Sequence, residues 1–191
     1  RDKSWQTFSA SAIKRDRHWP TPKELKKNDL LNLVKKFKST AIRAKRIGFD
    51  CLEIHMAHGY LLHQFISPIS NKRKDIFGGS LNNRLRLPLL IAKKIREIWP
   101  KNKILGARIT GSDHLKGGID INESVFLVKE LEKIGLNYVC VSSGGILTKT
   151  NLKPNKKAFR LKLAEKIRKK TKILIRTSGN LSYPKLLKKI V

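Results

Sequence analysis

The sequence predicts an α/β protein built around a parallel sheet. From residue 28 onward, apolar strand-like runs alternate with amphipathic helical patterns. One helix-to-strand joint occurs twice, as Arg46-Ile-Gly-Phe-Asp-Cys-Leu-Glu-Ile and as Lys133-Ile-Gly-Leu-Asn-Tyr-Val-Cys-Val. Strands that alternate with helices of this length pair in parallel through right-handed crossovers.

The first 27 residues predict a loop that leads into the domain. Residues 1–22 carry no clear apolar periodicity. The segment Thr21-Pro22-Lys-Glu24 has the form of a capping box with proline at the first helical position, which predicts a short helical turn. We therefore divide the chain into a leading loop over residues 1–27 and one domain over residues 28–191.

The domain opens with a long helix and a strand. Apolar residues recur at helical spacing from Asn28, with lysines on the opposite side. Gly48 suits a left-handed cap at the end of this helix. A strand is expected over Asp50 to Ile54.

The second helical pattern contains a proline. It covers Arg84 to Trp99, and because Pro88 is tolerated best in a first turn, we expect the regular helix to start near Leu87. The apolar run from Ile104 to Ile109 then predicts a buried strand.

The alternation continues to the end of the chain. Asp120 opens a third helix, and Gly135 repeats the role of Gly48. The remaining patterns predict a helix over about 157–170, a strand over 173–175 and a helical start at Ser182.

Chemically reactive residues concentrate where the first strand ends. His55 and His58 can converge only if the chain leaves extended geometry between them, which places both at the carboxyl end of a strand. Two neutral imidazoles could hold a carbonyl oxygen or a phenolate, and Tyr60 could deliver a proton. The alternatives are satisfied strand-end histidines or a zinc site, for which no acidic or cysteine partner has a recognisable spacing.

The run from Glu53 to Arg84 resembles the old yellow enzyme family of flavin-dependent NADPH dehydrogenases and ene-reductases. The matching residues include Glu53-Ile-His55-Met-Ala-His58-Gly-Tyr60 and, further on, Ser67-Pro68-Ile-Ser-Asn71-Lys-Arg73-Lys-Asp75-Ile-Phe-Gly78-Gly79-Ser80. The resemblance implies a (β/α)₈ TIM barrel. The chain has about four β/α units where such a barrel has eight. It would therefore be a fragment that contains barrel strands four to seven.

The resemblance also implies cofactors and roles. FMN would pass hydride from NADPH to an α,β-unsaturated carbonyl compound. His55 and His58 would hold the carbonyl oxygen of that compound, and Tyr60 would donate a proton to its α-carbon.

Further cofactor contacts are implied by the resemblance. Arg108 matches the family arginine beside the flavin ring, although a structural ion pair with Glu53 is the alternative. Ser143 and Gly144 match a Ser-Ser-Gly segment beneath the cofactor, and Gly179 lies where the family approaches the flavin phosphate. Each of these turns could also be only a turn.

Polar residues of the loop after the histidines have an expected structural role. The charges there can pair across the loop and fix the segment that bears the histidines. The residues are Asn71, Arg73, Asp75 and Arg84.

Composition limits the partners. The formal net charge is +29, but lysines are spread over the polar faces of all helices, which favours weak, salt-sensitive adhesion to polyanions over specific nucleic-acid binding. No apolar run is long enough to span a bilayer. Cys51 and Cys140 are expected to be small core residues in a cytoplasmic, reduced protein.

The sequence therefore predicts an FMN-dependent NADPH dehydrogenase or ene-reductase whose substrate is a small enone or related electrophile. The alternative is a catalytically inactive half-barrel that acts as a basic interaction module. The two unpaired edges of a half-barrel would favour association, so a homo-oligomer is among the expected partners.

Overall fold

A four-stranded parallel sheet forms the centre of the computed structural model, which describes residues 5–149, 158–182 and 184–185. The strands follow chain order across the sheet as β3 (Cys51–Met56), β4 (Ile104–Thr110), β5 (Tyr138–Ser142) and β6 (Leu174–Thr177). The connecting helices are α2 (Leu61–Ile66) and α3 (Leu81–Arg96) after β3, α4 (Ile121–Ile134) after β4, and α5 (Leu161–Arg168) after β5. The predicted α/β class with a parallel sheet is confirmed.

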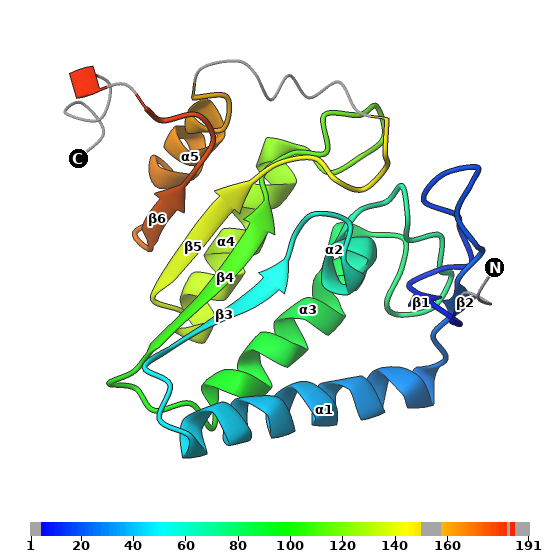
Figure 1. The fold of residues 1–191 in the computed structure, drawn as a ribbon, viewed down its shortest axis with the longest axis horizontal. Coiled ribbons are helices and arrows are strands. Elements are labelled where there is room, and N and C mark those ends of the chain that lie inside the picture. Colours follow the sequence, from blue (N-terminus) through cyan, green and yellow to red (C-terminus); the bar gives the residue numbers. More distant parts are fainter. Residues whose placement is uncertain (1–4, 150–157, 183, 186–191) are drawn as a thin grey trace.

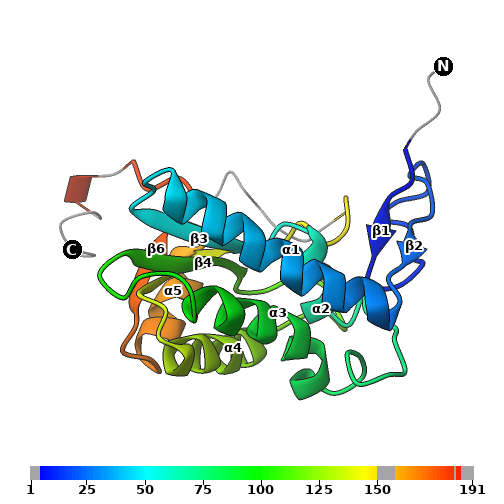
Figure 2. The ribbon, with the colours of Figure 1, turned by 90° about the horizontal axis from the view of Figure 1, so that it is seen from below.

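Helices pack against one face of the sheet. Figures 1 and 2 show α3 and α4 on this face, with α1 (Lys27–Arg46) running beside α3. Ile54, Ala107 and Val139 lie in register on adjacent strands and are at most 4% exposed, so they form the core beneath the helices. Because side chains alternate along a strand, His55, Arg108 and Cys140 share the opposite face.

The repeated joint has one geometry in both places. Gly48 and Gly135 follow α1 and α4 with φ angles of 90° and 91°, the left-handed region that glycine adopts without penalty. The N–H of Phe49 donates to the carbonyl of Ala44, and the N–H of Leu136 donates to that of Leu131. These six-residue closures are Schellman caps, which turn the chain directly into β3 and β5.

The leading segment contains two short strands where a loop and a helical turn were expected. β1 (Phe8–Ser9) pairs in parallel with β2 (Lys23–Glu24). The predicted helical turn after Thr21 is wrong because the N–H groups of Lys23 and Leu25 donate to the carbonyls of Thr7 and Ser9 instead. Helix α1 starts later, where the backbone N–H of Lys26 donates to the Asp29 carboxylate at 2.8 Å.

Helix α3 starts six residues earlier than Pro88 suggested. It begins at Leu81 behind Ser80, whose hydroxyl accepts from the N–H of Asn83. Pro88 lies inside the helix and removes one hydrogen bond. The side chains of Leu85, Leu87 and Ile91 are at most 1% exposed, and their burial offsets this loss.

Two further differences concern short helices. The six-residue helix α2 was not predicted; it positions the loop after the histidines. The predicted helix over 157–170 forms from Leu161, and the helical start at Ser182 falls largely outside the described residues. Within the described part of the chain, no helix combines the length and apolar character needed to cross a membrane.

Candidate functional site

The two histidines converge at the carboxyl end of β3. His55 is the last residue but one of the strand, and the chain then turns through His58 and Gly59 with φ angles of 61° and 76°. The two imidazole centroids lie 5.2 Å apart with the rings nearly perpendicular. The chain therefore leaves extended geometry between them, as predicted.

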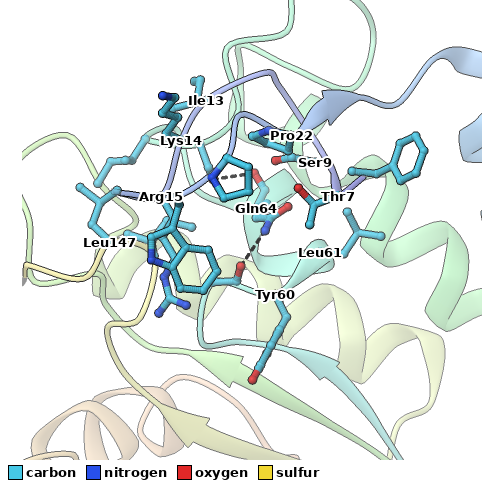
Figure 3. A pocket seen from close by; sticks show the side chains of 17 residues that line it. Thr7, Ser9, Ile13, Lys14, Arg15, Pro22, Tyr60, Leu61, Gln64 and Leu147 are labelled. Atoms are coloured by element: carbon cyan, nitrogen blue, oxygen red, sulfur yellow. Dashed lines mark hydrogen bonds between the residues drawn. The ribbon is translucent and has the colours of Figure 1, made fainter. Parts of the chain in front are cut away.

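Tyr60 joins this pair. Its ring centroid lies 5.0 Å from that of His55, and the residue is 59% exposed. Figure 3 shows its side chain pointing away from the neighbouring pocket. The three residues with predicted catalytic roles are thus together on the open face of the sheet; their roles stay a prediction.

Hydrogen bonds determine which ring nitrogen of each histidine carries a proton and can donate to a ligand. The backbone N–H of Ala57 donates to Nδ1 of His55 at 3.2 Å, so the proton of His55 is on Nε2. Nε2 of His58 lies 2.6 Å from the hydroxyl of Ser142. When that hydroxyl donates, Nδ1 of His58 carries the ring proton and is a second donor.

Both imidazoles are neutral at neutral pH. Burial, followed by the charges of Arg108 and His55, lowers the pKa of His58 to about 4. Burial and Arg108 also lower the pKa of His55, against an opposing effect of Glu53. Neutral donors can stabilise a developing negative charge on an oxygen without exchanging a proton with it.

Arg108 lies beside His55 on the next strand. Residues His55, Arg108 and Cys140 are in register across β3, β4 and β5. The Nε atom of Arg108 is buried and has no hydrogen-bond partner among the residues that the structure describes. Since an unsatisfied buried donor is costly, this atom is suited to an anionic or acceptor-rich ligand.

The alternative partner of Arg108 is engaged elsewhere. Glu53 accepts a hydrogen bond from the hydroxyl of Tyr138 at 2.8 Å and lies 3.9 Å from the guanidinium of Arg176. A structural ion pair between Glu53 and Arg108 is not among the described contacts. The role of Arg108 at a cofactor stays a prediction.

The predicted cofactor-binding turns lie at the same end of the sheet. Ser143 is buried directly after β5, and the N–H of Gly144 donates to the carbonyl of Ser112 at 2.8 Å. Gly179 follows β6 with a φ of 117°, and a Cβ there would lie 2.7 Å from the ring of Phe159. Both glycine positions have left-handed backbones that other residues rarely adopt.

Two glycines hold the histidine turn against the turn after β5. A Cβ on Gly59 would lie 2.2 Å from the carbonyl oxygen of Gly145, and one on Gly145 would lie 2.7 Å from Cα of His58. Real side chains do not fit into these gaps. Close backbone packing therefore fixes where His58 lies relative to Ser143 and Gly144.

A buried histidine and carboxylate support the site from behind, and sequence reasoning assigned neither a role. Nδ1 of His63 accepts from the N–H of Gly59 at 2.8 Å, so Nε2 donates to Asp113, 3.0 Å away. The hydroxyl of Ser67 donates to the same carboxylate at 2.6 Å. The only available signals were a histidine inside an apolar helical run and an aspartate just after a strand.

The polar loop residues have the structural role that was expected. The guanidinium of Arg73 pairs with Asp75 at 2.6 Å and donates to the carbonyls of Ala10 and Leu25. The side-chain amide of Asn71 donates to the carbonyls of Phe65 and Phe77. The guanidinium of Arg84 donates to the carbonyl of Ile66 and to the carboxylate of Glu123.

The cysteines differ from one another. Cys140 is buried as expected, but the prediction for Cys51 is wrong, since it is exposed at the start of β3. Its side chain falls on the face that the helices do not cover. Both thiols are free, and the described residues contain no group of three or more potential metal ligands.

A cavity of about 370 Å³ adjoins the histidine turn. Figure 3 shows it between the leading segment, with Thr7 and Arg15, and the start of α2, with Leu61 and Gln64. Its lining is mainly apolar and includes Trp19. It offers room for an apolar group beside Tyr60.

The link between Arg108 and His58 can be measured directly. Because the charge of Arg108 helps to lower the pKa of His58, Arg108→Gln should raise that pKa from about 4 toward its ordinary value of 6.5. An NMR titration of the His58 ring measures the shift. Arg86→Gln, on an exposed helix position, is the matched control and should leave it unchanged. An unchanged His58 titration in the Arg108 variant would contradict the assigned geometry.

Comparisons with known proteins concern the family and the fold of the chain. The NADH:flavin oxidoreductase / NADH oxidase family matches residues 5–191. The chain is 41% identical over 167 residues to the NADPH dehydrogenase of Clostridium acetobutylicum, covering 86% of this chain and 48% of that protein. The chain spans about half the length of the curated relatives it matches.

Solved structures share the fold. A 2-naphthoyl-CoA reductase complex superposes with a TM-score of 0.89 at 23% identity, covering 96% of this chain and 29% of the other. Morphinone reductase in complex with tetrahydroNAD gives 0.75 at 26% identity, covering 93% and 50%. These likenesses confirm the predicted fold class, a partial (β/α)₈ barrel.

Proposed function

Because the chain belongs to the NADH:flavin oxidoreductase / NADH oxidase family, we propose that it supplies the substrate-binding half of an FMN-dependent NADPH dehydrogenase of the old yellow enzyme type. The proposed electron acceptor is a small α,β-unsaturated carbonyl compound. We also propose that residues 1–27 lead into a functional unit of residues 28–191, and that the protein works in the cytoplasm, where its two free thiols would stay reduced.

One observation carries the proposal. Two neutral imidazoles, 5.2 Å apart, lie beside a buried guanidinium nitrogen that has no partner among the described residues. The first feature suits an oxygen that gains negative charge during reaction. The second suits a ring system that accepts hydrogen bonds and becomes anionic on reduction.

The residues present fit FMN. The unpartnered Nε of Arg108 would face the ring of FMN. Ser143, Gly144 and Gly179 would contact the cofactor at the strand ends. When bound, FMN supplies two-electron chemistry, taking hydride from NADPH and giving it to the acceptor. The protein's part is to hold, orient and polarise these molecules.

The histidines polarise the acceptor. N–H groups of His55 and His58 would donate to its carbonyl oxygen and stabilise the negative charge that develops there. Since the pKa of His58 is about 4, it remains a neutral donor through the physiological range. The hydroxyl of Tyr60 would give a proton to the α-carbon.

The proposal is tested by adding FMN to the purified protein and measuring NADPH oxidation with and without a cyclic enone. We expect bound flavin and enone-dependent oxidation. Tyr60→Phe should retain flavin while slowing reduction of the enone, since it removes only the hydroxyl. Protein that cannot be reconstituted with FMN would instead support the inactive basic module.

A further inference from the structure

The cavity beside the histidine turn is separate from the face of the sheet that carries the histidines. It lies between the leading segment and the start of α2 (Figure 3). Among the residues that the structure describes, His55, His58 and Arg108 are not part of its lining, and the ring of Tyr60 points away from it. The proposed binding of the acceptor and of FMN therefore gives this cavity no role.

Hydrogen bonds fix the wall that the leading segment contributes. Nη2 of Arg15 donates to the carbonyl of Gly145 at 3.1 Å, and the hydroxyl of Thr148 donates to the carboxylate of Asp16. Both contacts join the leading segment to the turn after β5. The cavity is therefore formed before a ligand arrives, as small-molecule sites usually are.

The walls of the cavity are mainly apolar and partly open to solvent. Trp19 and Phe8 line it and are 48% and 53% exposed, so two aromatic rings there are incompletely packed. Leu61 and Ile146 add aliphatic walls from α2 and from the turn after β5. The volume of about 370 Å³ equals that of roughly a dozen water molecules and lies in the usual range of ligand sites. A ligand ring would cover the exposed aromatic surface.

The charges at the cavity have one sign. Lys14 and Arg15 line it, and no described lining residue is acidic. None of the ion pairs in the described part of the chain involves either cation. The guanidinium of Arg15 has one described acceptor, the carbonyl of Gly145, and its Nε is buried without a described partner. A guanidinium with unused donors pairs well with a carboxylate, which it can hold through two parallel hydrogen bonds.

We propose that this cavity binds a small aromatic carboxylate. The ring would lie against Trp19 and Leu61, and the carboxylate would face Arg15 and Lys14. A neutral ligand would leave both cations uncompensated, and an acid without a ring would leave the aromatic walls uncovered. The site goes beyond the proposed function and does not depend on it, because it uses neither the histidines nor Arg108.

The test compares benzoate with benzamide, which has the same ring and nearly the same shape but no charge. Isothermal titration calorimetry should show that wild-type protein binds benzoate more tightly. Arg15→Gln should weaken benzoate binding by roughly tenfold, the size of a lost hydrogen bond to a charged group, and leave benzamide within about twofold. Arg15→Lys keeps the charge but loses the fork, so it should retain part of the preference for benzoate.

Arg17→Gln is the matched control, because Arg17 is exposed and is not among the described residues that line the cavity. It should leave the ratio of benzoate to benzamide affinity unchanged. Since a folding defect would weaken the binding of both probes, this ratio isolates the effect of charge. Equal affinities of the two probes for wild-type protein, or an unchanged ratio in Arg15→Gln, would overturn the proposal.

A further variant separates this site from the histidines, which could also bind benzoate. His55→Ala combined with His58→Ala should leave benzoate affinity within about twofold of wild type, because the two sites share no side chain. Loss of benzoate binding in this variant would overturn the proposal. Reconstitution with FMN is a separate measurement: protein that binds benzoate through Arg15 but does not bind FMN would refute only the proposed function.

Discussion

Replacing His55 and His58 together by alanine is expected to abolish phenol binding and to slow enone reduction by at least about 10²–10³-fold, the loss measured when one oxyanion donor is removed. The reason is geometric, since the two rings are the neutral N–H donors that converge at the end of β3. Phenol titrations followed by calorimetry and kinetics with a cyclic enone measure the two losses independently.

A conservative variant separates donor chemistry from folding. His58 has a φ of 61°, a conformation that asparagine tolerates better than alanine does. His58→Asn keeps a donor in this turn, so it should retain more phenol affinity than His58→Ala while unfolding at nearly the wild-type urea concentration. His18→Ala, in the leading segment, is the control. Unchanged phenol binding in the double alanine variant would refute the assigned role of the pair.

The largest expected loss of stability follows from Asp113→Asn. The carboxylate accepts from His63, from the hydroxyl of Ser67 and from the N–H of Ile119. His63 and Asp113 are fully buried, and a hydrogen bond to a charged group contributes about 1.5–3 kcal/mol, so losing the carboxylate should cost at least about 2 kcal/mol. Urea unfolding measures the change. Asp50→Asn, at a side chain that is 94% exposed, should stay within about 0.5 kcal/mol of wild type.

The loss in Asp113→Asn should depend on pH. Burial alone would raise the pKa of Asp113, but the hydrogen bonds from His63 and Ser67 outweigh burial and hold that pKa below its ordinary value. A lowered folded-state pKa adds stability above the unfolded pKa of about 3.9, and this stability is lost as the pH falls through the folded value. The difference in free energy of unfolding between wild type and Asp113→Asn should therefore become smaller as the pH is lowered. A difference that became larger would show that the carboxylate is not the stabilising form.

Local signals predicted much of the architecture. Apolar periodicity located α1, α4 and the central strands, and glycine after an apolar residue predicted both helix-to-strand joints at Gly48 and Gly135. Pairing between distant segments was not predictable in this way. Lys23 is extended because it pairs with the strand at Phe8, and α3 continues through Pro88 because its flanking leucines are buried.

The site shows the same division. The sequence by itself determined that two histidines, a tyrosine and an arginine follow or lie within strands of a parallel sheet, because alternation and turn residues are local properties. Only the tertiary structure decided that Glu53 pairs with Tyr138, that His63 and Asp113 form a buried pair behind the turn, and that Arg15 reaches the turn after β5. Such contacts join residues up to 130 positions apart, and strand register and helix packing, which no local pattern encodes, bring them together.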